Sequence, residues 1–147
     1  MYKRILVATD GSKLSKMAVE HAINLADLTG AEVVALKVVP RYPQTYFEGG
    51  VALAATEISK IESQWQEEAM AVVNAVKSAG QKREIKVKAM TAKSDLVAEA
   101  IIAAAKRSKC DLIIMASHGR KGLKRLLLGS ETTHVLTHSH TPVLVLR

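Results

Sequence analysis

The sequence predicts an α/β fold in which a doubly wound parallel sheet of five strands is covered by four helices. Short apolar segments of strand length alternate along the chain with longer amphipathic segments, which is the pattern of successive βα units. Three of the apolar segments, residues 5–8, 112–116 and 143–146, contain no charged side chain. Uninterrupted apolar segments of this kind are typical of strands that are buried on both faces of a sheet.

Local signals give the bounds of the strands and of the first two helices. The strands are expected at residues 4–8, 32–39, 85–90, 112–116 and 143–146. Ser12 is placed to cap the first helix and Gly30 to end it, because serine favours helix N-caps and glycine favours the position after the last turn. Apolar residues at helical spacing from Ile58 to Val76 predict the second helix, with Gly80 as its stop.

The remaining elements complete one expected domain, residues 1–147, because the length is that of an average domain and no internal repeat is present. Ser94 or Asp95 is expected to cap the third helix, which runs to Arg107, and residues 130–138 have the pattern of the fourth. Residues 40–56 form a long connection that is either functional or a surface excursion.

The two edges of the predicted sheet differ in charge. The third strand segment places Glu84, Lys86 and Lys88 at every second position, and such charges protect an edge strand from pairing with another molecule. The last strand, Val143 to Leu146, has no charge to protect it. If it forms the other edge, we expect it to pair with the same strand of a second copy and to make a homodimer.

Composition favours a small anionic ligand. The chain has 21 Lys and Arg against 14 Asp and Glu, a formal net charge of +7, which favours anionic partners. Aromatic residues make up only 3% of the chain, too few for the stacking surfaces that usually hold single-stranded nucleic acid. A nucleotide therefore fits better than nucleic acid, which is unlikely as a partner and would depend on charge alone.

The lone cysteine, Cys110, excludes an internal disulfide, as expected of a reduced compartment, and we expect it to be buried as a small apolar residue. The apolar segment after Lys3 and Arg4 is too short for a signal peptide, and no segment approaches the length needed to span a membrane. The sequence therefore predicts a cytoplasmic protein without a membrane partner.

The most informative spacing lies near the end of the chain. It reads Ala116-Ser117-His118-Gly119, then nine residues, then Gly129-Ser130, and it joins an expected strand to an expected helix. The first amides of a helix lack partners within the helix and carry about half a positive charge, so a loop of small residues at a helix start suits an anion. The spacing predicts a loop whose backbone surrounds phosphate groups.

A second segment is expected to face this loop. In doubly wound sheets, ligands bind beyond the carboxyl ends of the strands, where the chain order reverses direction. If the first and fourth strands are neighbours there, Thr9 and Asp10 line one crevice with the loop, and Val38 and Val39 add an apolar wall. A nucleotide needs this division, with an apolar slot for the base, a polar group for the ribose and amides for the phosphates.

With these motifs the chain resembles the nucleotide-binding branch of the universal stress protein family. The family motif is a glycine, two residues, a glycine, nine residues, and a glycine followed by serine or threonine. Here Ala116 takes the place of the first glycine, and Gly119 and Gly129-Ser130 supply the rest. The similarity extends over essentially the whole chain. It implies a Rossmann-like sheet in the strand order 3-2-1-4-5, a stress-response role and an ATP site in the crevice.

The resemblance also implies the parts of that site. Asp10 and Val38 would lie by the ribose and adenine, the second half of the motif would surround the phosphates, and Mg²⁺ would be held mainly by the phosphates. The expected nucleotide contacts are Thr9, Asp10, Val38, Val39, Ala116, Ser117, His118, Gly119, Arg120, Gly129, Ser130 and Glu131.

Four of these residues carry specific expectations. Gly119 can adopt a positive φ and lets amides approach an oxygen closely, and Glu131 is expected to contribute only its amide, because its carboxylate would repel phosphate. Ala116 is tolerated if its φ is negative, whereas a positive φ would cost about 1 kcal/mol and weaken binding. Asp10 has a second reading as the cap of the first helix, although Ser12 already supplies one.

Two clusters of side chains each have a structural interpretation as well as a functional one. His134 and His138 stand four residues apart, but no cysteine or carboxylate completes a metal site, so we expect exposed or capping histidines and no metal ligands. Four cations within the motif either raise anion affinity or form a solvated face: Arg120, Lys121, Lys124 and Arg125.

The sequence predicts no catalytic residue. It has neither a Walker A motif nor a Gly-x-Gly-x-x-Gly motif, and Asp10 is the only plausible carboxylate of the crevice. We therefore expect an ATP-binding regulatory protein with no dedicated catalysis, and slow ATP hydrolysis stays open. The alternative is a dimeric interaction protein of the same fold whose crevice binds no nucleotide.

Overall fold

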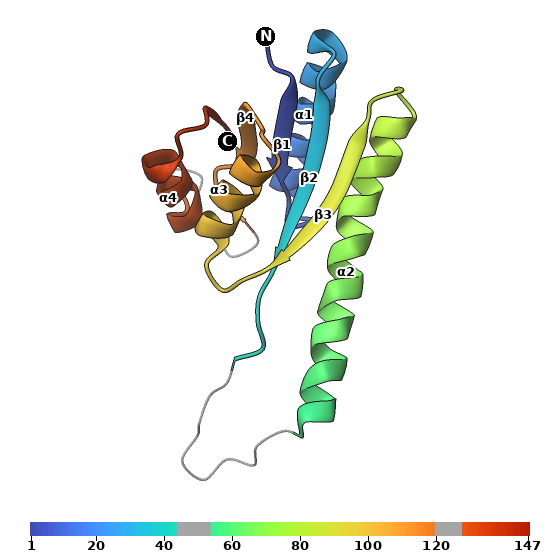
Figure 1. Ribbon diagram of the computed structural model, residues 1–147, viewed down its shortest axis with the longest axis vertical. Coiled ribbons are helices and arrows are strands. Elements are labelled where there is room, and N and C mark those ends of the chain that lie inside the picture. The colour runs from blue at the N-terminus through green and yellow to red at the C-terminus, as the bar shows by residue number, and fades with distance from the viewer. Residues whose placement is uncertain (44–53, 120–127) are drawn as a thin grey trace.

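A computed structural model describes residues 1–43, 54–119 and 128–147. Strands and helices alternate in the order β1 (Arg4–Ala8), α1 (Lys13–Thr29), β2 (Glu32–Val39), α2 (Ala55–Gln81), β3 (Val87–Lys93), α3 (Val97–Arg107), β4 (Leu112–Ala116), α4 (Ser130–His138) and β5 (Val143–Leu146). All strand pairs are parallel, and the sheet has the order β3-β2-β1-β4-β5 (Figure 1). The predicted fold class and strand order are confirmed.

Two expected features fall mostly or wholly outside the described residues. The central part of the 40–56 connection is one of them, although its two ends are described. The other is the cationic segment from Arg120 to Arg125.

Each face of the sheet is covered by two helices. Because side chains alternate along a strand, Ile5 and Val7 pack on one face with α1 and α2, whereas Leu6 packs on the other with α3 and α4. All three of these β1 side chains are fully buried, which makes β1 the centre of the core. The amino-terminal part of α2 extends beyond the carboxyl ends of the strands (Figure 1).

The predicted limits of α1 are confirmed. The Ser12 hydroxyl accepts a hydrogen bond from the Ser15 amide at 3.2 Å, and Gly30 follows the helix with φ 74°. A side chain at Gly30 would be strained by this left-handed conformation, which is why glycine suits the position.

The prediction that Gly80 ends α2 is wrong. The helix continues to Gln81, and Gly80 is buried within its last turn. A Cβ placed on Gly80 would lie 2.2 Å from Cγ2 of Val87 and 3.3 Å from the Ile85 carbonyl oxygen. Glycine is therefore needed there because β3 passes close to the helix.

The observed β3 starts and ends later than the predicted residues 85–90, because a turn occupies the positions before Val87. Glu84 has φ 59°, and the Ile85 amide donates to the Gly80 carbonyl at 2.9 Å, so Ile85 still belongs to the turn. The strand begins at Val87 and continues to Lys93, opposite the end of β2. It is an edge strand, as predicted.

The prediction that Ser94 or Asp95 caps α3 is also wrong. The helix begins at Val97, and its N-cap residue, Leu96, makes no side-chain cap. The Ser94 hydroxyl accepts from the Leu96 amide at 3.0 Å, and the Asp95 carboxylate accepts from the Arg41 amide at 2.9 Å. The Ser94 side chain therefore shapes the turn before α3, and the Asp95 side chain binds the segment that follows β2.

Cys110 is buried, as expected, and burial raises the pKa of its thiol to about 11. No helix within the described ranges is both long and apolar enough to cross a membrane.

We expect Gly80→Ala to lower the free energy of unfolding by about 1–3 kcal/mol, because the added methyl group overlaps the Val87 side chain. Urea denaturation measures this loss. In a Val87→Ala background, which lacks Cγ2, the same substitution should cost less. An equal cost in both backgrounds would contradict the close contact.

We expect the folded protein to react at pH 8 at least about 100-fold more slowly with a thiol-specific disulfide reagent than the denatured chain does. Only the thiolate reacts, and a pKa of about 11 leaves a very small thiolate fraction at pH 8. Stopped-flow absorbance compares the two rates. Similar rates would show that Cys110 is accessible.

Candidate functional site

Parallel pairing of β1 with β4 brings two distant loops together. Ile5 lies opposite Leu112 and Val7 opposite Ile114, so both strands end at the same edge of the sheet. A Cβ placed on Gly119 would lie 2.6 Å from Oδ2 of Asp10, which means that the carboxylate rests against the glycine backbone. The two segments therefore line one crevice.

Asp10 organises the turn that leads into α1. Its Oδ1 atom accepts a hydrogen bond from the Ser12 amide at 2.9 Å, whereas Ser12 itself is the N-cap residue. The reading of Asp10 as the helix cap is therefore wrong. Its carboxylate joins the start of α1 to the loop that follows β4.

Thr9 takes a different position from Asp10. Its side chain is buried, and its hydroxyl lies 3.1 Å from the hydroxyl of Ser15, on the α1 side of the sheet. The same oxygen accepts from the Gly11 amide at 3.3 Å. The Thr9 hydroxyl therefore makes its hydrogen bonds within the protein.

The two halves of the motif are joined by hydrogen bonds to consecutive carbonyls. The Thr132 hydroxyl donates to the Ala116 carbonyl at 3.0 Å, and the Gly129 amide donates to the Ser117 carbonyl at 2.7 Å. A Cβ on Gly129 would lie 3.2 Å from the Ser117 oxygen. Close approach of the two backbones therefore explains the glycine at 129.

The start of α4 faces this loop with its amides. Its N-cap residue, Gly129, is extended at φ −62° and ψ 154° and makes no side-chain cap. Ser130 is exposed and begins the first turn. Helix amides in this position retain the ability to donate to an anion.

The Glu131 carboxylate is directed toward another helix. Its Oε2 atom accepts a hydrogen bond from the Ala98 amide at 2.9 Å, in the first turn of α3. A carboxylate is favourable there because the amino end of a helix carries partial positive charge. Glu131 therefore links α4 to α3 through its side chain.

Neither Gly119 nor Ala116 has a left-handed backbone. Gly119 does not use the positive φ that glycine permits, and the contact with Asp10 accounts for the glycine. Ala116 is the last residue of β4, opposite Leu146, and is not among the non-glycine residues with positive φ. The backbone penalty considered for Ala116 does not arise.

Ser117 and His118 continue from β4 into the loop. The Ser117 amide donates to the Leu146 carbonyl at 2.7 Å, and its buried hydroxyl lies 3.1 Å from Nδ1 of His118. The His118 ring is half-buried beside this pair. Arg120, the next expected contact, lies outside the described residues.

A cavity of about 180 Å³ adjoins Asp10 on the α2 side of the sheet. Val39 lines it, whereas Val38 packs among the residues of the opposite face, because the two side chains alternate along β2. The predicted apolar wall is therefore divided between two faces. The cavity is lined by Asp10, Lys37, Val39, Pro40, Trp65, Glu68, Ala69 and Val72.

Sequence reasoning missed Lys37, Trp65 and Glu68 as neighbours of Asp10. Lys37 carried a detectable signal, since it interrupts an otherwise apolar strand after Glu32. The two α2 residues had no such signal, because only the packing of the helix on the sheet brings them there. Trp65 also stacks with Tyr42 at a ring-centroid distance of 6.1 Å.

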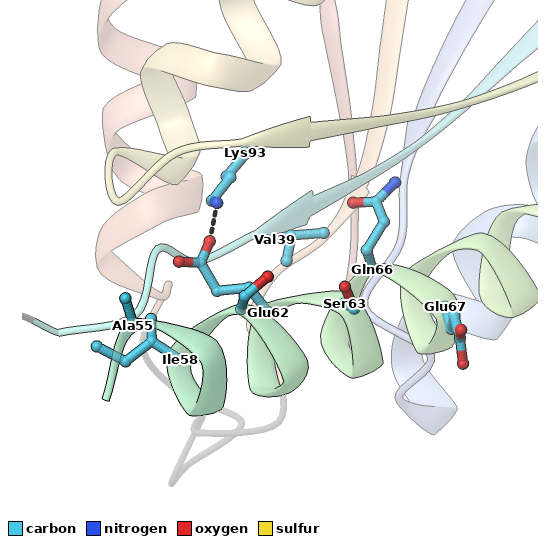
Figure 2. A pocket seen from close by; sticks show the side chains of 9 residues that line it. Val39, Ala55, Ile58, Glu62, Ser63, Gln66, Glu67 and Lys93 are labelled. Atoms are coloured by element: carbon cyan, nitrogen blue, oxygen red, sulfur yellow. Dashed lines mark ion pairs between the residues drawn. The ribbon is translucent and has the colours of Figure 1, made fainter. Parts of the chain in front are cut away.

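A larger groove of about 620 Å³ lies where α2 passes the ends of β2 and β3. Figure 2 shows the Glu62 carboxylate reaching the ammonium group of Lys93 across it. Farther along, the Gln66 amide donates to the Thr91 hydroxyl at 2.8 Å. These contacts tie α2 to the edge strand, so the groove is bridged by polar interactions.

Comparison with known proteins gives a family. The family model described as the universal stress protein family matches residues 1–147. Universal stress protein MJ0531 of Methanocaldococcus jannaschii is 36% identical over 147 residues, which cover all of this chain and 83% of that protein. Universal stress protein MJ0577 of the same organism is 30% identical over 156 residues, covering all of this chain and 96% of that protein.

Solved structures agree with this assignment. The structure of MJ0577 matches with a TM-score of 0.81 over 99% of this chain and 96% of that one. At lower identity the fold is shared with a universal stress protein in complex with cAMP (22% identity, TM-score 0.72, 99% and 97% covered). It is also shared with an Arabidopsis thaliana family member with AMP bound (14%, TM-score 0.69, 98% and 90% covered). This chain belongs to the universal stress protein family.

Proposed function

We propose that this protein binds ATP in the crevice beyond β1 and β4 and acts as a regulatory stress-response protein. One observation carries the proposal: the Asp10 carboxylate rests against Gly119 beside a helix start that no side chain caps. A hydrogen-bond acceptor for a sugar and amide donors for phosphate are thereby combined in one crevice. The AMP and cAMP complexes of proteins with this fold are compatible with such a ligand.

Each part of the nucleotide has a proposed place. Ligand pockets for whole small molecules typically measure about 300–1,000 Å³, so the cavity beside Val39 and Trp65 has room for only one part, and we assign it the base. Asp10 would bind the ribose. Amides of Gly119, Ser130 and Glu131 would bind the phosphates, which in turn would hold Mg²⁺.

The other expected contacts take supporting roles in this proposal. Thr9 and Val38 would contribute backbone groups, because their side chains pack within the protein or on the opposite face. Ser117 would support the loop, since its amide donates to Leu146 and its carbonyl accepts from Gly129. Ala116 and His118 would line the loop. Gly129 would hold the loop against the helix start through its bond to the Ser117 carbonyl. Arg120 would add positive charge.

A regulatory role is favoured over dedicated catalysis by the contacts of Asp10 and Glu131, the acids beside the proposed phosphate site. Asp10 is engaged with the Ser12 amide, and Glu131 is engaged with α3. Phosphoryl transfer needs groups that hold metal and orient the nucleophile, and these two carboxylates already serve the fold. We expect at most slow ATP hydrolysis. We further propose that residues 1–147 form one domain that works in the cytoplasm.

The exposed edge at β5 supports a second part of the proposal, a homodimer. The carbonyls of Pro142 and Leu146 accept hydrogen bonds from the amides of Ile113, on β4, and of Ser117, directly after it. Because backbone groups alternate in direction, those of the intervening Val145 point away from β4. An uncharged edge with outward-pointing donors and acceptors suits pairing with a second copy. If the crevice binds no nucleotide, this surface is the basis of the alternative function, a dimeric interaction protein.

We expect Asp10→Asn to weaken ATP binding about 10–100-fold, because a hydrogen bond to a charged acceptor contributes about 1.5–3 kcal/mol. The amide oxygen can still accept from Ser12, so the turn should persist. Calorimetric titration with Mg-ATP measures the affinity. Asp27→Asn, at an exposed ion pair with Arg83 near the end of α1, is the matched control and should bind like the wild type.

Two outcomes would contradict the ATP site. One is the absence of detectable wild-type binding at millimolar Mg-ATP. The other is an equal loss in Asp10→Asn and Asp27→Asn. Release of nucleotide from the denatured wild-type protein, but not from a Gly119→Asp variant that places a carboxylate by the phosphates, would distinguish a nucleotide-binding protein from the alternative.

We expect Val145→Pro to convert a dimer into a monomer, because proline removes an outward N–H donor from β5. Multi-angle light scattering at micromolar concentration measures the mass. Val145→Thr keeps the N–H and the branched shape, and it should remain dimeric. A monomeric wild type, or a Val145→Pro variant that stays folded and dimeric, would contradict pairing through β5.

A further inference from the structure

The last helix carries two imidazoles on one face, away from the crevice at its other end. His134 and His138 lie one turn apart on α4, and residues four apart project from the same side of a helix. Their ring centroids are 4.2 Å apart, and the ring planes differ by 32°. His138 is exposed and His134 is half-buried. Two nitrogen ligands are thus presented together at the surface.

A backbone contact orients the second ring. Nδ1 of His138 lies 3.0 Å from the carbonyl oxygen of His134. A carbonyl only accepts, so Nδ1 must carry the hydrogen, and in the neutral ring the lone pair is on Nε2. Histidine ligands of metal ions are usually oriented in this way, through a hydrogen bond from the nitrogen that does not bind the metal.

We propose that His134 and His138 together bind one divalent transition-metal ion of the zinc, nickel and copper class. Neutral imidazole suits these ions, and two histidines at this spacing on a helix can bind one zinc ion. A metal bound at 2.0–2.1 Å to each nitrogen requires the two nitrogens to be about 3.3 Å apart. The 4.2 Å between the ring centroids places the two imidazoles at a separation of the same order.

The site uses two protein ligands, and water completes the coordination. In the described part of the chain, no group of three or more His, Cys, Asp or Glu side chains is arranged to hold a metal. Glu131, one turn before His134, directs its carboxylate to the Ala98 amide and is not a third ligand. The site is therefore open and exchangeable. It does not depend on the proposed nucleotide site.

The test is calorimetric titration of the untagged, full-length protein with Zn²⁺ at about pH 7.5 in a non-chelating buffer. We expect one ion per chain, and we expect His134→Gln and His138→Gln each to weaken binding at least tenfold. His21→Gln is the matched control, because Nδ1 of His21 also lies 3.0 Å from a carbonyl oxygen, that of Met17. His21 has no histidine four residues away, so its loss should leave the affinity unchanged.

A further measurement separates chelation from nonspecific binding. Zn²⁺ should raise the melting temperature of the wild type and of His21→Gln, but not of His134→Gln. Circular dichroism verifies that each variant is folded.

Several results would overturn the proposal. They are the absence of saturable wild-type binding at submillimolar Zn²⁺, an equal loss in His21→Gln, and full binding by either His134→Gln or His138→Gln. Loss of binding in His140→Gln together with its retention in His134→Gln would likewise place the site elsewhere.

Discussion

The fold of this protein depends on the parallel pairing of β1 with both β2 and β4. Chain order reverses direction at β1, so the loops after β1 and β4 leave the sheet side by side. Ile5, Leu6 and Val7 are fully buried on alternate faces, and a shift of register by one residue would move each of them to the wrong face. The same burial that stabilises the sheet therefore places Asp10 against Gly119.

Around this crevice, close backbone contacts explain the small residues better than unusual conformations do. Gly119 makes room for a carboxylate, Gly129 makes room for the Ser117 carbonyl, and Gly80 makes room for Val87 in the same way at the other end of the molecule. Hydrogen bonds to the carbonyls of Ala116 and Ser117 then hold α4 at the end of β4. The start of α4 is thus positioned by contacts with the end of β4.

Helix α4 has opposite chemistry at its two ends. Its first turn presents amides and suits an anion, whereas its last turn carries the histidine pair proposed to bind a cation. The partial charges of a helix favour this arrangement, because its amino end is positive and its carboxyl end negative. Glu131 adds a connection from the first turn to α3, so α4 contacts the loop after β4, a neighbouring helix and the edge strand within nine residues.

Local pattern was sufficient for the fold class, the limits of α1 and the burial of Cys110. These follow from periodicity, caps and apolar segments, which act over a few neighbouring residues. The order of the strands was implied by the family resemblance. The pattern also named Asp10 and the 116–119 loop as neighbours. Contacts between distant residues decided the rest. The Glu131 carboxylate caps the first turn of α3 by accepting from the Ala98 amide, 33 positions away in the chain. Glycine is needed at position 80 because Val87, beyond the next turn, packs against it. Trp65 and Glu68 reach the cavity beside Asp10 only because α2 packs on the sheet. No local pattern encodes such contacts, because each depends on how complete elements pack against one another.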